Sequence, residues 1–220
     1  MYSFIKRFFD LILALILIAI LFIPLLPIII GLVATGEHYV FYFQERIGLH
    51  LKKFNIIKFA TMLKNSPSIG TGTITTRNDP RVLPMGKFLR ITKLNELPQI
   101  LNVLIGNMSF VGPRPLVAKQ FGYYPPAMQT QIMQCKPGIT GIGSIVFRDE
   151  EELVSKSTLP PQAFYQTVIS PYKGALEIWY SDNKSFYVDF MILFLTAWVI
   201  ISKESKLVYK VFKNLPEKNF

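Results

Sequence analysis

The stretch from Lys93 to Pro115 reads KLNELPQILNVLIGNMSFVGPRP and joins a helix pattern to a turn pattern. Leucines recur in its first half at intervals of three or four residues, which predicts a helix over Lys93 to Leu104. Phe110 to Pro115 contains a glycine and two prolines, which is typical of a stiff turn. The polar pair Asn95 and Glu96 falls inside the helical pattern. The stretch therefore predicts chemistry-bearing side chains on a helix that is followed closely by a rigid turn.

Upstream of this stretch, Leu11 to Ala34 is almost wholly apolar and is flanked on both sides by lysine and arginine. About 20 apolar residues suffice to span a bilayer as a helix. Pro24 and Pro27 lie inside the segment, and we expect a helix break at Pro24. Basic residues mark the cytoplasmic side, so two basic flanks favour a re-entrant helix that returns to the same face. A spanning helix with a proline kink is the alternative. Residues 1–36 form this membrane segment.

The remainder of the chain predicts an α+β fold that is mainly helical. We expect short strands at Tyr39 to Phe43 and Phe54 to Phe59. Val82 to Ile91 mixes apolar and basic residues, as an amphipathic helix on a membrane surface does. Phe186 to Ile201 is apolar and aromatic, and suits either a membrane interface or a buried core. Residues 37–220 are expected to act as one unit on the membrane surface.

Composition points to an anionic partner. Of the 220 residues, 50% are hydrophobic and 17% are charged, which indicates a membrane contribution. Lysine and arginine number 24 against 14 acidic residues, giving a net charge of +10. Such a charge suits nucleic acid, anionic lipid or a phosphorylated substrate, and the apolar N-terminus favours lipid over nucleic acid. The acidic run Asp149 to Glu152 is interpreted as a solvated loop or helix start. The lone Cys135 excludes an intramolecular disulfide.

The stretch Leu94 to Pro115 resembles the core of the bacterial sugar transferase family, the monotopic polyprenyl-phosphate phosphoglycosyl transferases. The similarity extends in order along nearly the whole chain, which makes it more specific than any single block. The other blocks that resemble the family are Lys6 to Asp10, Gln44 to Gly48, Ile57 to Met62, Lys136 to Gly141, and Asn183 to Phe186 with Asp189.

The resemblance implies transfer of a sugar 1-phosphate from a nucleotide diphosphate sugar, such as a UDP-sugar, to polyprenyl phosphate. The products would be a polyprenyl diphosphate sugar and a nucleoside monophosphate, and Mg²⁺ is the implied cofactor. This is the first membrane step of a polysaccharide or glycoconjugate pathway, at the cytoplasmic face of a bacterial inner membrane. The implied partners are the lipid acceptor, the nucleotide sugar and the bilayer, without nucleic acid. The oligomeric state stays open, with a dimer as one option.

Arginine offers a planar fork that matches phosphate oxygens, so basic residues in the similar blocks are candidates for substrate binding. Arg114 lies between two prolines on the predicted stiff turn and is the first candidate, with Pro113 beside it. A solvated role or a contact with lipid headgroups is the alternative for the other basic residues. These further candidates are Arg46, Lys58, Arg77, Arg81, Arg90 and Arg148.

Asn95 departs from the family pattern, which has an Asp-Glu pair whose aspartate attacks the diphosphate. An amide is a poor nucleophile and a weak metal ligand. Three hypotheses remain: Glu96 takes over with Asn95 orienting a phosphate, the acceptor attacks directly, or the chain is a catalytically impaired scaffold or binding homologue. We take Glu96, Asn95 and Arg114 as the catalytic candidates. Glu96 and Glu177 are the metal-ligand candidates, Glu177 because it occupies an acidic position of the family.

Overall fold

Helices supply most of the secondary structure in the part of the chain that the structure describes, and short strands complete a mixed α/β fold. This computed structural model describes residues 2–70, 74–76, 78–202 and 206–218. The helices are α1 (Tyr2–Ala34), α2 (Pro84–Ile91), α3 (Gln99–Ile105), α4 (Ala118–Phe121), α5 (Pro126–Ile132), α6 (Ile142–Val146), α7 (Glu150–Lys156), α8 (Pro161–Phe164), α9 (Ser170–Asn183), α10 (Phe186–Ser202) and α11 (Leu207–Val211). The strands are β1 (Phe41–Ile47), β2 (Lys53–Phe59), β3 (Ser109–Val111) and β4 (Gly138–Thr140). A short 3-10 helix, η3 (Leu94–Glu96), precedes α3.

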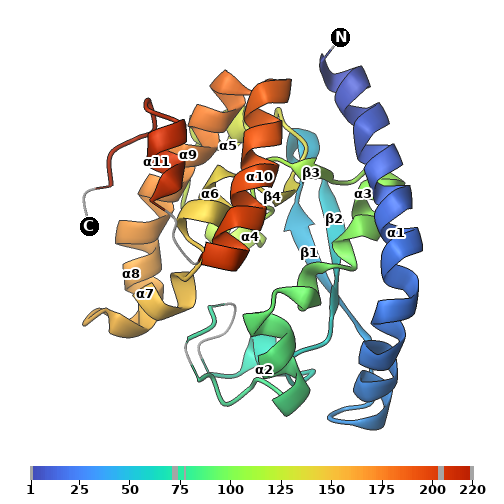
Figure 1. Ribbon diagram of the computed structural model, residues 1–220. Coiled ribbons are helices and arrows are strands. Elements are labelled where there is room, and N and C mark those ends of the chain that lie inside the picture. Colours follow the sequence, from blue (N-terminus) through green and yellow to red (C-terminus); the bar gives the residue numbers. More distant parts are fainter. Residues whose placement is uncertain (1, 71–73, 77, 203–205, 219–220) are drawn as a thin grey trace.

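The N-terminal helix α1 lies along one side of the molecule, beside α3 (Figure 1). It is one helix from Tyr2 to Ala34, with Pro24 and Pro27 inside it. The helix therefore does not break at Pro24 as expected, because each proline removes only one backbone hydrogen bond and apolar helix formers continue on both sides. By length and composition, α1 is able to cross a membrane. Its re-entrant course stays a prediction.

Side chains in the first turns of α1 fix this helix to the rest of the chain. Arg7 donates to two backbone carbonyl oxygens at the C-terminal end of α3, at 2.5 and 3.0 Å, where a cation is favourable. Asp10 accepts the backbone N–H of Phe110 at 3.1 Å, which connects α1 to β3. Lys6 forms an ion pair of 2.6 Å with Asp189 in the first turn of α10. The basic and acidic residues of this N-terminal block therefore hold α1 in place.

Strands β1 and β2 form an antiparallel hairpin, and their register puts Arg46 and Lys58 on the same face. Asn102 of α3 fixes this hairpin from the side. Its Oδ1 accepts the backbone N–H of Ile57 at 2.9 Å, and its Nδ2 donates to the carbonyl oxygen of Asn55 at 2.8 Å. Asn102 is 1% exposed, so its own amide is shielded from water. The amide of Asn102 thus sets the position of Lys58 relative to η3 and α3.

Strands β3 and β4 pair in parallel and bring two distant glycine-containing blocks into contact. A Cβ atom added to Gly112 would lie 2.2 Å from the carbonyl oxygen of Lys136. One added to Gly141 would lie 2.2 Å from the carbonyl oxygen of Gly112. Only glycine allows so close an approach of two backbones. The turn that carries Arg114 leaves β3 at this junction, which fixes its starting point.

Large apolar side chains cover the outward surfaces of α1, α2 and α10. A continuous apolar surface of this kind marks a contact with a membrane or with another protein. A membrane is the contact that the sequence predicts, although the course of α2 along a membrane surface stays a prediction. The most exposed of these side chains are Phe4, Phe22, Ile23 and Ile30 of α1, Phe88 and Ile91 of α2, and Tyr187, Phe190, Ile200 and Ile201 of α10.

Candidate active site

Glu96 lies at the centre of a group of cationic side chains. Its Oε1 accepts hydrogen bonds from Lys58 Nζ and Arg114 Nη2, both at 2.9 Å. The three residues come from η3, from β2 and from the turn after β3. Burial alone would raise the pKa of Glu96, but the charges of Arg114 and Lys58 outweigh burial and hold this pKa well below its usual range. Glu96 is therefore a carboxylate at neutral pH.

Arg46 adds a third cation to the group. Its guanidinium donates to the carbonyl oxygen of Pro115 at 3.2 Å and to Gln44 Oε1 at 2.5 Å. Burial, and then the charge of Arg114, lower the pKa of Arg46 to about 10. Burial also lowers the pKa of Lys58 to about 8. Three cations around one carboxylate leave a positive potential that attracts a further anion.

Asn95 lies next to Glu96 and carries an amide oxygen that the protein does not satisfy. The residue is 7% exposed, and its Oδ1 is buried without a hydrogen-bond partner in the described part of the chain. The chain enters η3 through Lys93, whose φ of 60° is uncommon for a residue other than glycine. An unpaired buried acceptor costs free energy, and a ligand that binds Oδ1 would remove this cost. Asn95 is therefore positioned to contact a ligand.

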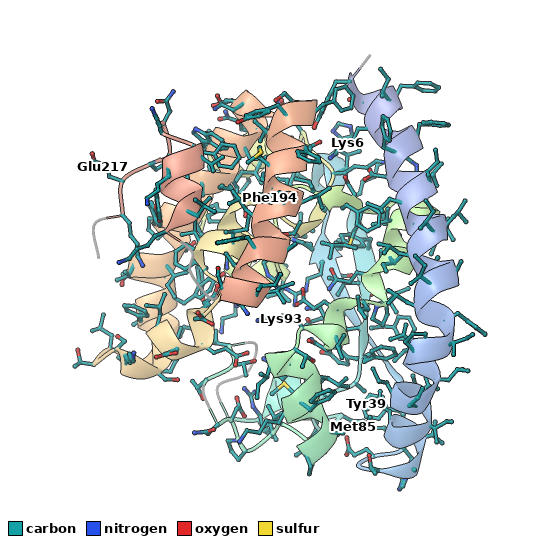
Figure 2. The ribbon with its side chains drawn as sticks, viewed as in Figure 1. Lys6, Tyr39, Met85, Lys93, Phe194 and Glu217 are labelled. Atoms are coloured by element: carbon teal, nitrogen blue, oxygen red, sulfur yellow. The ribbon has the colours of Figure 1, made fainter. Side chains whose placement is uncertain are left out.

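These side chains line a cleft of about 490 Å³, a size usual for small-molecule sites. Figure 2 shows Lys93 between α2 and the C-terminal end of α10. The charged part of the wall contains Glu96 and the cations around it. The apolar part includes Leu17 of α1 and Val199 and Ile200 of α10. A cleft with these two kinds of wall suits a ligand that joins a charged group to an apolar chain.

Two more ion pairs line the charged part of the cleft. Arg90 pairs with Glu151, and Lys173 pairs with Glu150. Arg148 also lines the cleft, and its Nη1 is buried without a partner among the described residues. The acidic run forms the first turn of α7, which confirms the helix start expected from sequence, and two of its residues, Glu150 and Glu151, line the cleft. Arg90 and Arg148, both candidates for substrate binding, thus line the cleft.

Arg81 belongs to the fold rather than to the cleft. It is 4% exposed and binds both carboxylate oxygens of Asp79, at 2.8 and 2.6 Å. It also donates to the carbonyl oxygens of Ser66 and Ile74, at 2.8 and 2.9 Å. These bonds occupy its guanidinium, so we correct its predicted substrate-binding role to a structural one. Arg77, another predicted candidate, lies outside the residues that the structure describes.

Pro113 and Glu177 support the turn of Arg114 and lie outside the set of described residues that line the cleft. The carbonyl oxygen of Pro113 accepts the backbone N–H of Gly138 at 2.9 Å. Glu177 is 3% exposed, and its Oε1 accepts the backbone N–H of Arg114 at 3.3 Å. Burial raises the pKa of Glu177 to about 7. Pro113 and Glu177 thus position the turn, and the Oε2 of Glu177 is buried without a hydrogen-bond partner among the described residues. The substrate contact of Pro113 and the metal contact of Glu177 stay predictions.

The cleft offers two oxygen donors that suit Mg²⁺. The hydrogen bonds to Glu96 from described residues end on Oε1, which leaves Oε2 for a ligand, and Asn95 contributes its unpaired Oδ1. Within the described ranges, no three His, Cys, Asp or Glu side chains come together as a metal site. Mg²⁺ commonly takes one or two protein oxygens and completes its shell with waters and substrate phosphates. Glu96 Oε2, with the weaker amide donor Asn95 Oδ1, is therefore the candidate ligand for an ion that is shared with a bound diphosphate.

Among the cleft residues that were not singled out from sequence are Lys93, Tyr165 and Lys173. Lys93 lies two residues before Asn95, and this proximity in sequence was an available signal. Tyr165 and Lys173 come from elsewhere in the chain, and the ammonium of Lys173 lies 5.6 Å from the ring centroid of Tyr165. Their approach depends on the packing of α9 against its neighbours, so no local pattern reveals it.

Comparisons with known proteins find similarity along most of the chain. A family model described as bacterial sugar transferase matches residues 1–203. The UDP-galactose-lipid carrier transferase of Erwinia amylovora is 33% identical over 215 residues, 91% of this chain and 41% of that protein. The exopolysaccharide production protein ExoY of Sinorhizobium fredii is 34% identical over 206 residues, 87% of this chain and 83% of that protein. The UDP-glucose:undecaprenyl-phosphate glucose-1-phosphate transferase of Klebsiella pneumoniae is 35% identical over 199 residues, 88% of this chain and 39% of that protein. The chain thus spans less than half of the first and third relatives.

Proposed function

Because the chain belongs to the bacterial sugar transferase family, we propose that it transfers a sugar 1-phosphate from a UDP-sugar to a polyprenyl phosphate. The products are a polyprenyl diphosphate sugar and UMP. The reaction named for the Klebsiella pneumoniae relative is of this class. The reaction would open a polysaccharide or glycoconjugate pathway at the cytoplasmic face of the inner membrane, where α1 enters the bilayer.

The observation that carries this proposal is the ionised Glu96 held by Lys58 and Arg114 at 2.9 Å. Cleavage of a diphosphate needs cations at the oxygens where negative charge develops. With Arg46 beside them, these cations exceed the charge of Glu96 and attract the diphosphate of the donor. The guanidinium of Arg114 is able to bind two phosphate oxygens at once.

The apolar part of the cleft supports a lipid acceptor. Leu17 of α1, together with Val199 and Ile200 of α10, lies on the same cleft as Glu96. Since α1 is the apolar helix expected in the bilayer, an acceptor chain would reach the cleft along it. The acceptor phosphate would then meet the cationic group without leaving the membrane surface.

We assign the nucleophile to Glu96, since Asn95 replaces the aspartate that the family resemblance implies. The Glu96 carboxylate attacks the phosphorus that bears the sugar, which breaks the bond to UMP and forms an acyl phosphate. A phosphate oxygen of the acceptor then attacks the same phosphorus, which breaks the acyl phosphate and restores the carboxylate. Asn95 orients a phosphate oxygen through its amide. In the competing mechanism, the acceptor attacks the donor directly.

Mg²⁺ would be held by Glu96 and by the Oδ1 of Asn95. When bound, it supplies positive charge that neutralises the diphosphate. The other positive charges that face the diphosphate come from the side chains of the cleft. Arg114 and Lys58 orient the donor, and the apolar wall excludes water from the reacting phosphorus.

The test is UMP release by the full chain in nanodiscs that contain undecaprenyl phosphate and Mg²⁺, across a panel of UDP-sugars. We expect release with at least one sugar, and loss to background in Glu96→Gln. Glu45→Gln is the matched control, because Glu45 is exposed and pairs with Lys53 outside the cleft. Absence of release with every sugar would contradict the proposed reaction.

The nucleophile is tested with a donor labelled in the phosphate attached to the sugar. Denaturation during turnover is expected to trap label on the protein, in a form that hydroxylamine releases, and Glu96→Gln is expected to trap none. UMP release without trapped label, and only in the presence of acceptor, would favour direct attack. Higher activity in Asn95→Asp would show that the site still accepts an aspartate nucleophile.

A further inference from the structure

A second cavity, of about 90 Å³, lies where the first turns of α1 meet β3, the residues before β4 and the C-terminal end of α9. Figure 2 shows Lys6, which lines this cavity, between α1 and one end of α10. The cavity is separate from the main cleft and shares no lining residue with it. Most of the residues that line it carry a polar or charged group, and four of them are basic. The charged side chains that line it are Lys6, Arg7, Asp10, Lys136 and Lys184.

Two of these cations have no acidic partner in the described part of the chain. Lys6 is neutralised by Asp189, and Arg7 donates to backbone carbonyl oxygens. Lys136 forms no ion pair with a described residue, and the Nζ of Lys184 lies 3.3 Å from the sulfur of Cys135. Burial, and then the charge of Arg7, lower the pKa of Lys136. The nearby Asp10 offsets only part of this positive charge.

A hydroxyl without a partner faces the same cavity. Ser109 of β3 is 1% exposed, and its Oγ has no hydrogen-bond partner among the described residues. A buried hydroxyl in this state costs free energy until a ligand or water pairs with it. Ser109 is a donor that suits an anionic oxygen, and the two unpaired lysines supply the opposite charge. The three groups together form the donor set of an anion site.

The surroundings place this cavity at the level of a membrane interface. Phe8 and Phe9, on the same turns of α1, are 56% and 59% exposed. Tyr187, at the start of α10, is 64% exposed. Aromatic side chains of this kind gather where lipid chains meet headgroups. A cavity of about 90 Å³ is too small for a nucleotide sugar but admits a single phosphate group.

We propose that this cavity binds a phosphate group through Lys136, Lys184 and Ser109. The group belongs either to the headgroup of an anionic glycerophospholipid or to free inorganic phosphate. A bound phosphate would join α1 to β3 and α10 by charge, and so stabilise the docked position of α1. This inference does not depend on the transferase reaction, since phosphate binding is measured without turnover.

The experiment compares the parent chain with Lys136→Gln/Lys184→Gln and with Ser109→Ala. One arm follows thermal unfolding of detergent-solubilised protein against inorganic phosphate at constant ionic strength. The other uses native mass spectrometry to count phosphatidylglycerol retained from nanodiscs of phosphatidylcholine and phosphatidylglycerol. Lys119→Gln/Lys213→Gln is the matched control, because it removes the same charge from exposed positions outside the cavity.

For the double lysine variant, we expect the half-saturating concentration of the bound species to rise at least about tenfold, as loss of charge-assisted hydrogen bonds implies. Retained phosphatidylglycerol without stabilisation by inorganic phosphate would assign the site to a lipid headgroup. Stabilisation by phosphate without lipid retention would assign it to the free anion. Binding of neither species, or equal loss in the control variant, would overturn the proposal. So would a Ser109→Ala variant that is more stable but binds the anion unchanged.

Discussion

The carboxylate of Glu177 accepts the backbone N–H of Arg114 at 3.3 Å, at the base of the turn whose guanidinium binds Glu96. Arg114 is thus held at its backbone by the buried Glu177 and at its side chain by the half-buried Glu96. The pKa values of the two carboxyl groups shift in opposite directions because their surroundings differ. Glu96 has two cations within hydrogen-bonding distance, whereas burial dominates at Glu177.

Glu177 is expected to make stability depend on pH. Burial raises its pKa from 4.5 to about 7, so the folded chain holds a proton that the unfolded chain releases between these values. Its contribution is fully present below pH 4.5 and is lost as pH rises through about 7, by roughly 3 kcal/mol. Thermal unfolding of Glu177→Gln is expected to lack this loss, because glutamine keeps the acceptor and does not ionise. The exposed Glu217→Gln serves as control, and an unchanged pH profile in Glu177→Gln would refute the assignment.

Lys58 is expected to set an alkaline limit on activity. Burial lowers its pKa to about 8, so its ammonium loses its charge as pH rises through that value. UMP release should fall over the same range, because attraction for the donor diphosphate weakens. In Lys58→Arg the charge persists, and the alkaline limb should move to higher pH even if the maximal rate is lower. Full pH–rate profiles of both proteins check this, and an unmoved limb would assign the titration to another group.

Arg114→Lys is expected to lower kcat by about a hundredfold, the usual cost of losing one donor to a developing charge. Lysine retains the positive charge but not the planar fork that binds two oxygens. Steady-state UMP release measures the effect, with the exposed Lys53→Gln as control. An increase in KM with an unchanged kcat would mean that Arg114 binds the donor equally well before and during the reaction.

Asn102→Ala is expected to destabilise the fold by about 1–3 kcal/mol. The substitution removes the partner of the half-buried N–H of Ile57, which costs about 1–3 kcal/mol, whereas the carbonyl of the exposed Asn55 is able to turn to water. Thermal or denaturant unfolding checks this, with the exposed Asn107→Ala on the same segment as control. Equal stability of the two variants would mean that water replaces both bonds.

Local patterns in the sequence predicted the helices and strands better than the points at which one element ends and the next begins. The strand at Phe54 to Phe59 and the helix at Val82 to Ile91 are confirmed within a few residues as β2 and α2. The single helix expected over Lys93 to Leu104 divides into η3 and α3. Pro98 lacks an N–H and Lys93 adopts a left-handed conformation, so a continuous helix does not form there.

The cationic group was predictable because its members lie in blocks that resemble one family. Lys58 and Arg114 meet at Glu96 as expected of substrate-binding residues near a catalytic carboxylate. The role of Glu177 was not predictable, since its partner Arg114 is 63 residues away in sequence and the contact is with a backbone atom. The structural role of Arg81 could have been predicted from sequence, because Asp79 lies two residues earlier and is able to form an ion pair with it within a turn.

The hydrogen bond from the backbone N–H of Phe110 to Asp10 connects α1 to the strand that leads into the turn of Arg114. Three residues lie between Phe110 and Arg114, so the four Cα-to-Cα steps span at most about 14 Å. With α1 inserted in the membrane as proposed, this span would limit the height of the Arg114 guanidinium above the lipid. A lipid acceptor would then have to present its phosphate within that limit, so a change in bilayer thickness or in the tilt of α1 would alter the rate without changing the side chains around Glu96.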